Sequence, residues 1–397
     1  MTKARILYIL PPTRKFAGIE RVVDEIADTI AADYGDRFEI SVLHLADYGD
    51  FVIGERRYTV LRGNVRHRWH MLRVIRQVVK TGSFDLVIVP QIEATTLVWL
   101  TCVGLDSGLI LHLHGNPRHE NTHPKAQLLF ALFRRLVLSR LSQVLGTSPR
   151  QLDAFSRDFP SRVGHHWAPN PVRRFAPVER RRTGPQDEVA FVSVGRFCRQ
   201  KGQDLMIEAF AELFRLRPQA RLVLVGYGDE DAVLKARVDE LGLSHKITFE
   251  HRPQDPSEAL ANADVYLSMS RWEGWSLAIC EALRFGLPVV SSDCDFGPSD
   301  ILVDARLGRL FASGDRSQAV AAMLYYCDNL VAEKAFAGFR AEHITRFDVE
   351  NAASGHVAGI CRALEARGDT SKRRAGKDPL DRSEPDHARP SVADSRL

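Results

Sequence analysis

The stretch Ser268–Asp300, SMSRWEGWSLAICEALRFGLPVVSSDCDFGPSD, decides the fold class. The apolar, β-prone run 263–269 predicts a buried parallel strand. In the turn that follows, Gly274 permits a close backbone approach and Ser276 can cap the next helix. That helix is expected to end at Gly286 and to be followed by a strand over 287–290. Its buried face should consist of Leu277, Ile279, Cys280 and Leu283.

The start of this helix predicts a phosphate site, because the free N–H groups and the dipole of a helix N-terminus favour anions. Two carboxylates, Glu273 and Glu281, flank that point with seven residues between them. Both can face one pocket, where carboxylates would accept hydrogen bonds from the paired hydroxyls of a sugar or ribose. The alternative is a Glu273 that interacts only with the helix dipole and a surface pair between Glu281 and Arg284.

The segment EGWSLAICEALRFGLPVV (273–290) resembles the E-x7-E segment of retaining GT-B glycosyltransferases of family 4, the glycosyl transferases group 1. The likeness runs from about residue 5 to about residue 350. It implies a cleft between two Rossmann-like domains, with a nucleotide-sugar donor on the second domain and an acceptor on the first. It also implies that Glu273 holds sugar hydroxyls, that Glu281 holds the ribose, and that the N–H groups of Trp275, Ser276 and Leu277 meet the diphosphate.

Composition sets the outer limits. The chain has 397 residues, 45% hydrophobic and 26% charged, which suits two soluble domains. A net charge of +4 is too balanced to indicate nucleic-acid binding. Six scattered cysteines without a CxxC pair indicate reduced, cytoplasmic thiols and no zinc site. We expect no signal peptide, and the apolar run 94–105 is too short to span a bilayer.

Strand and helix patterns alternate along the chain, which predicts an α/β protein with doubly wound parallel sheets. We expect a first domain over 1–172, a linker rich in proline and arginine over 173–187, and a second domain over 188–348. By the resemblance, a helix over 349–366 should cross back onto the first domain. Residues 368–397 contain no aromatic residue and are expected to be disordered.

The second domain opens with VSVGRFCRQKG (192–202), a strand, a glycine turn and several cations at a helix start. Such a segment suits a polyphosphate. The resemblance places Arg196 and Lys201 on the donor diphosphate. The alternative is a basic surface loop.

In the first domain, the resemblance assigns Gly18 to the phosphate and acceptor, although Ala17 stands where the family often has a first glycine. It also assigns His114 to the transferred sugar, and Asn116 can donate to the same sugar. His112 points to the opposite face of the strand and is expected to be packing.

No cofactor and no divalent metal are expected. Asp293-Cys294-Asp295 spells D-x-D, a metal motif of another glycosyltransferase fold, but its place after a strand of the second half argues against that use. We also expect no metal cluster from the first-domain histidines His112, His114, His119 and His123, because the path of the chain scatters them.

Basic amphipathic helices of the first domain suggest contact with anionic lipid. One basic segment interleaves Arg66, Arg68, Arg73, Arg76 and Lys80 with Trp69. The helix over 126–141 is also basic and apolar. The alternative is a solvated face over a packed core.

The resemblance, together with these observations, implies a retaining, metal-independent hexosyltransferase in the cytoplasm, at the inner face of the plasma membrane. It would move a hexose or N-acetylhexosamine from a nucleotide-sugar, with UDP favoured, to a glycan or lipid-linked glycan acceptor of the cell surface. The alternative is a catalytically silent GT-B subunit that binds or scaffolds. A pyridoxal-dependent phosphorylase and an NAD-dependent oxidoreductase are disfavoured, because neither a lysine motif for the first nor a G-x-G-x-x-G after the first strand is present.

Overall fold

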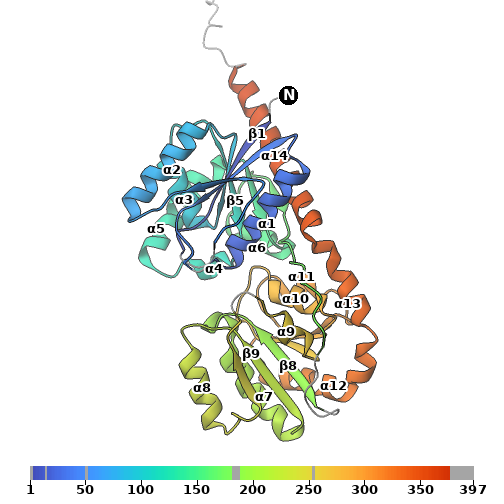
Figure 1. Cartoon of the computed structure of the whole chain (residues 1–397). Helices are drawn as coiled ribbons and strands as arrows, with labels where there is room; N and C mark the ends of the chain where they lie inside the picture. The colour runs from blue at the N-terminus through green and yellow to red at the C-terminus, as the bar shows by residue number, and fades with distance from the viewer. Residues whose placement is uncertain (1–2, 14–15, 50–51, 181–187, 253–254, 376–397) are drawn as a thin grey trace, which may run out of the picture.

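The chain folds into two α/β domains, stacked one above the other in Figure 1 and each built on a parallel sheet. The structure is a computed structural model that describes residues 3–13, 16–49, 52–180, 188–252 and 255–375. The predicted fold class, two doubly wound parallel sheets, is confirmed. Part of the predicted linker, 181–187, lies outside the described residues.

The first sheet has the strand order β3-β2-β1-β4-β5-β6-β7, with every neighbour parallel. The interior strand β1 is apolar at nearly every position because both of its faces are covered: Leu7 and Ile9 join one core, while Ile6 and Tyr8 join the other. The strands are β1 (Ala4–Ile9), β2 (Phe38–His44), β3 (Thr59–Arg62), β4 (Leu86–Pro90), β5 (Gly108–Leu113), β6 (Gln143–Gly146) and β7 (His165–Trp167).

Helices cover both faces of the first sheet (Figure 1). On one face α2, α3 and α5 bury Ile75, Val98 and Phe130, and on the other α1 buries Ile26. The helices of this domain are α1 (Gly18–Asp33), α2 (Arg68–Gly82), α3 (Ile92–Thr101), α4 (Pro117–Glu120), α5 (Pro124–Leu132) and α6 (Pro149–Asp158).

The second sheet has the order β10-β9-β8-β11-β12-β13 and is also parallel throughout. Its strands are β8 (Val189–Val194), β9 (Ala220–Val225), β10 (Ile247–Glu250), β11 (Val265–Ser268), β12 (Val289–Asp293) and β13 (Gly308–Ala312). The helices around it are α7 (Gln203–Leu216), α8 (Asp231–Glu240), α9 (Ser257–Ala261), α10 (Leu277–Arg284), α11 (Pro298–Ile301), α12 (Arg316–Lys334) and α13 (Ala337–Ile344).

Three helix boundaries differ from the sequence predictions. The expected helix 126–141 is a composite: α5 is followed by a π-helical turn η1 (Phe133–Val137) and a 3₁₀ turn η2 (Leu138–Arg140). The sequence also predicts two helices over 316–329 and 331–345 with a break at residue 330, but the break falls instead after Lys334. The last helix α14 (Val349–Ala375) runs past the predicted end at Ala366 and into the segment expected to be disordered. Residues 376–397 lie outside the described residues.

The C-terminal helix α14 leaves the second domain and lies along the first (Figure 1). It packs against α1 and the first sheet, where Ala352, Ala353, Val357 and Ile360 are buried. Small side chains on its buried face permit this close packing.

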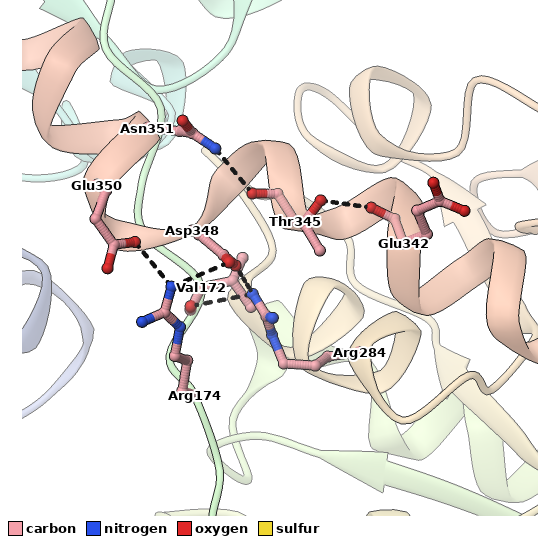
Figure 2. A network of polar contacts seen from close by, with 8 residues as sticks. All are labelled: Val172, Arg174, Arg284, Glu342, Thr345, Asp348, Glu350 and Asn351. Carbon is pink, nitrogen blue, oxygen red and sulfur yellow. Dashed lines mark hydrogen bonds and ion pairs between the residues drawn. The ribbon is translucent and has the colours of Figure 1, made fainter.

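The chain therefore crosses between the domains twice, and ion pairs tie the two crossings together (Figure 2). Arg284 on α10 contacts Asp348 and donates to the Val172 carbonyl at 3.4 Å. Arg174 reaches Asp348 at 3.3 Å and Glu350 at 3.0 Å. This network joins the second domain to the point where the linker begins. Among the described residues, no helix is both long and apolar enough to cross a bilayer.

Candidate active site

The loop between β11 and α10 supplies the centre of the site, and several contacts with the start of α7 hold it in place. Arg271 pairs with Asp204 at 2.6 Å and donates to the Arg199 carbonyl at 2.7 Å. Gly202, at φ +66°, begins α7 so close to this loop that a Cβ would lie 2.1 Å from the Met269 carbonyl oxygen. Only glycine fits there, and it brings the 3₁₀ turn η3 (Arg199–Lys201) against the loop.

Two of the predicted site residues meet here. Lys201 Nζ lies 2.6 Å from Glu273 Oε1, which also accepts a hydrogen bond from Ser270 Oγ at 2.7 Å. Glu273 is buried, and the Lys201 side chain is about one-fifth exposed. A buried carboxylate needs such a partner, because an unpaired charge in a low-dielectric site is costly. Lys201 also lines a small polar cavity with Ser193, Ser268, Ser270, Ser276, Gln203 and Tyr266.

Helix α10 begins at Leu277, directly after Ser276, where the sequence predicted the helix start. Ser276 occupies the N-cap position but its side chain makes no capping hydrogen bond, so the predicted cap is wrong. Among the described residues, the N–H groups of Trp275, Ser276 and Leu277 donate no backbone or side-chain hydrogen bond. These free donors remain available to an anion.

Arg196 does not reach the Lys201–Glu273 pair. Its guanidinium is on the exposed rim, 3.5 Å from the Gln200 side-chain oxygen. Gln200 in turn donates to the Trp272 carbonyl at 3.0 Å. Arg196 therefore borders the loop and is free to turn toward a ligand.

Glu281 on α10 is buried and is paired across the domain boundary. Arg173 Nε lies 2.8 Å and Arg21 Nη1 lies 3.7 Å from its Oε1. The alternative surface pair with Arg284 is wrong, because Arg284 instead contacts Asp348. The sequence predicted neither arginine, since both are more than 100 positions away in the chain.

Burial also raises the pKa of the nearby Glu25 carboxyl to about 7, although Arg21 and Arg173 oppose that shift. A second ionisable carboxyl group thus lies beside the pair that Glu281 forms with the first domain.

From the first domain, β5 brings His114 to the same place. The His114 carbonyl lies so close to Gly274 that a Cβ on that glycine would be 2.1 Å from its oxygen. Burial lowers the pKa of His114 to about 3, and His356 adds to the shift, so the ring is neutral. Its buried Nε2 has no hydrogen-bond partner among the described residues. A neutral ring with one unused nitrogen suits a hydroxyl ligand.

His112 is buried, but the prediction that it points to the opposite face of the strand from His114 is wrong, because residues two positions apart on a strand share a face. Its ring centroid lies 3.9 Å from that of His114 and 5.0 Å from that of His356 on α14. Burial and these two neighbours hold the pKa of His112 well below its ordinary value. The C-terminal helix thereby supports the cleft strand.

Gly18 begins α1 at the edge of the cleft. A Cβ at this position would meet nothing within 4 Å, so packing within the protein does not require a glycine there. Glu20 closes the helix start by accepting from the Ala17 N–H at 3.1 Å.

The segment 293–300, which contains the D-x-D letters, bridges the domains. Asp300 accepts from Ser148 Oγ at 2.9 Å, and Asp293 lies 3.5 Å from Arg150. The Asn116 side-chain nitrogen donates to Asp295 at 3.3 Å and so contributes to this bridge. His119 stacks on Trp272 at 4.5 Å between ring centroids. No group of three or more metal-ligating side chains is present among the described residues.

Sequence reasoning missed Glu120, which lies beside Gly115 at the cleft. Burial raises the pKa of its carboxyl to about 7, with Glu93 adding to the shift. A lone glutamate in a short helix carries no sequence signal. Its position becomes visible only when α4 folds against the end of β5.

Comparison with known proteins places this geometry in context. A family model described as Glycosyl transferases group 1 matches residues 177–335. A mannosylfructose-phosphate synthase of Agrobacterium fabrum is 31% identical over 175 residues, which cover 39% of this chain and 38% of the relative. The lipopolysaccharide core biosynthesis glycosyltransferase LpsE of Rhizobium meliloti is 34% identical over 131 residues, or 33% of this chain and 37% of LpsE. The matched part thus spans well under half of each relative.

Solved structures extend the likeness to both domains. Anabaena HepE in complex with UDP and glucose superposes with a TM-score of 0.71 at 20% identity, covering 90% of this chain and 99% of HepE. Sucrose-phosphate synthase of Thermosynechococcus elongatus gives a TM-score of 0.72 at 18% identity, covering 94% and 100%. The two domains therefore adopt the GT-B fold.

Proposed function

Because the second domain of this chain belongs to the glycosyl transferases group 1 family, we propose that the protein is a retaining glycosyltransferase. It moves a hexose or N-acetylhexosamine from a nucleotide-sugar to a glycan or lipid-linked glycan in the synthesis of surface polysaccharide or glycolipid. UDP is the favoured nucleotide, and the structurally similar HepE is described in complex with UDP and glucose. The similar LpsE is described as an enzyme of lipopolysaccharide core biosynthesis.

The observation that carries this proposal is the buried pair of Lys201 and Glu273, 2.6 Å apart beside the free N-terminus of α10. An ammonium group and unused N–H groups suit a diphosphate. The carboxylate next to them suits the hydroxyls of the attached sugar. Across the cleft, His114 contacts the same loop through its backbone carbonyl, and its ring has an unused nitrogen.

In the reaction, the bond between the anomeric carbon and the donor phosphate oxygen breaks, and a bond from that carbon to the acceptor oxygen forms. The acceptor proton passes to the departing phosphate. Negative charge grows on the diphosphate, where Lys201, Arg196 and the α10 N–H groups stabilise it. Glu273 and His114 orient the sugar, and Glu281 binds the ribose once Arg173 shifts. Such preorganised groups each contribute about 3–4 kcal/mol, or 10²–10³ in rate.

Metal independence is part of the same proposal. Arg150 and the Asn116 side chain already contact Asp293 and Asp295, the two carboxylates of the D-x-D letters. Transfer should therefore persist in EDTA and gain no more than twofold from added Mg²⁺ or Mn²⁺. A strict requirement for either ion would refute this part.

The test begins with thermal shifts of the full-length protein in UDP, GDP and ADP and their sugars. Transfer to membrane extract then follows with the best donor. Lys201→Ala and Glu273→Ala should each lower turnover at least ~100-fold. The matched control is Lys235→Ala, which removes an exposed lysine 2.7 Å from Asp231 in the same domain and should leave turnover unchanged.

Wild-type turnover in both site variants would refute the assignment. Donor binding without any transfer or donor hydrolysis would instead favour a catalytically silent subunit.

A further inference from the structure

A pocket of about 940 Å³ opens in the first domain, away from the Lys201–Glu273 pair. It lies where β1, β2 and β4 end and where α2, α3 and α5 begin, on the side of the sheet that these helices cover in Figure 1. Its walls are mostly aliphatic: Ile9, Leu45, Met71, Val89, Leu97 and Val98. A pocket of this size and lining suits an extended apolar ligand.

The mouth of the pocket is cationic. Arg66, Arg68 and Lys125 contribute to its lining, and all three are exposed. Within the described parts of the chain, none of the three lies within ion-pair distance of a carboxylate. Among the described residues that line the pocket, Glu93 is the only acidic one, and its carboxylate lies 3.8 Å from His123. Unpaired cations around an apolar cavity are complementary to an anionic head on an apolar chain.

Two large exposed apolar side chains lie close in the sequence to these cations, on α2 and α5. Trp69, on the first turn of α2, is 76% exposed, and Leu128 on α5 is 62% exposed. Aromatic and aliphatic side chains among cations are typical of a surface that meets a lipid interface. An amphiphile could therefore reach the pocket directly from a membrane.

The inner end of the pocket adjoins the cleft. Gln91 lines it and has φ +65° and ψ 155°, a backbone region that is strained for any residue but glycine. Its side-chain nitrogen is 3.8 Å from the place a Cβ on Gly115 would take. Gly115 follows His114, whose carbonyl contacts Gly274. A ligand that fills the pocket would thus end near the proposed sugar site.

We propose that this pocket binds an amphiphilic membrane lipid whose hydrocarbon chain fills the cavity and whose phosphate group rests on Arg66, Arg68 and Lys125. This binding does not depend on the proposed glycosyltransferase function. Chain burial supplies affinity, roughly fourfold for each CH₂ that leaves water, and the cations select the phosphate.

The binding test uses calorimetry with alkyl phosphates kept below their micelle concentrations. Octyl, decyl and dodecyl phosphate should bind progressively tighter, by roughly 15-fold for each added pair of CH₂ groups until the cavity is full. Dodecyl maltoside, with a neutral head, should bind at least tenfold more weakly than dodecyl phosphate. Inorganic phosphate should bind weakest of all. Equal affinity for dodecyl maltoside and dodecyl phosphate, or for inorganic and dodecyl phosphate, would overturn the proposal.

Variants locate the binding. Leu97→Trp and Ala94→Phe each place bulk in the cavity and should weaken dodecyl phosphate at least tenfold. The double variant Arg66→Ala/Arg68→Ala should weaken it about tenfold but spare dodecyl maltoside. The matched control is Arg73→Ala, an exposed arginine of α2 outside the lining, which should change nothing. Two filling variants are used so that one misfolded protein does not decide the result.

A UDP thermal shift separates this inference from the proposed function, because all these substitutions lie away from the donor loop. An unchanged shift with lost alkyl phosphate binding supports the pocket. If the filling variants bind both dodecyl phosphate and phosphatidylglycerol vesicles as tightly as the wild type does, only the surface attracts lipid, and the proposed pocket is refuted. Binding of alkyl phosphate without binding of any nucleotide-sugar would support the lipid pocket and refute the proposed glycosyltransferase function.

Discussion

Gly274→Ala should separate the two halves of the site without unfolding either domain. A Cβ at this position would lie 2.1 Å from the His114 carbonyl oxygen, 2.8 Å from the His114 carbonyl carbon and 3.0 Å from the Gly115 Cα. Ordinary contacts begin near 3.4 Å. All three neighbours are backbone atoms of β5 and its end, so no side chain can rotate away. The loop or the strand must therefore move by roughly 1 Å, and a shift of that size can cost ~10² in rate.

Overpacking of this kind also costs about 1–3 kcal/mol of stability. The assay is steady-state transfer with the best nucleotide-sugar, together with thermal unfolding and small-angle X-ray scattering. We expect kcat to fall about 100-fold, a modest fall in Tm and a larger radius of gyration in the presence of donor.

The matched control is Gly338→Ala on α13, where a Cβ would meet nothing within 4 Å. That substitution should leave turnover unchanged and stabilise the helix by up to ~1 kcal/mol. Wild-type kcat and unchanged scattering in Gly274→Ala would refute the inference that His114 and this loop must touch for transfer.

Two further substitutions probe buried ionisable groups. Glu120→Gln should stabilise the protein above pH 7: the folded pKa of about 7 exceeds the ordinary 4.5, so stability falls as pH rises from 4.5 to 7. The gain in the free energy of unfolding should reach ~3 kcal/mol at most and vanish below pH 4.5. Denaturant unfolding at several pH values measures it, and a gain that does not change with pH would contradict the prediction. Arg340→Ala removes a fully buried guanidinium that contacts Glu333 and donates to the Arg306 carbonyl at 2.7 Å. It should cost ~3–5 kcal/mol, most of which the pair Arg340→Met/Glu333→Leu should recover, whereas a loss under 1 kcal/mol in the single variant would show that the buried pair is not coupled.

The sequence alone determined most of the strands, although it missed β3, β7 and β13, and it located the turns that we propose bind phosphate. A buried parallel strand is apolar on both faces, so runs such as 263–269 are recognisable locally. The turn 273–276 and the start of α10 were also visible, because a helix start depends on a few adjacent residues. The same local rule failed at Ser276, whose side chain does not cap.

The tertiary structure alone decided which charged side chains form ion pairs and where the cavities lie. The partner of Glu273 is 72 positions away at Lys201, and that of Glu281 is Arg173 from the start of the linker. For Glu281, the spacing in the sequence had offered Arg284 as an alternative partner. Charges pair by distance in space and burial decides their pKa, so neither is contained in a local pattern. For the same reason the apolar pocket, lined by three strand ends and three helices, has no signature in any single stretch of the chain.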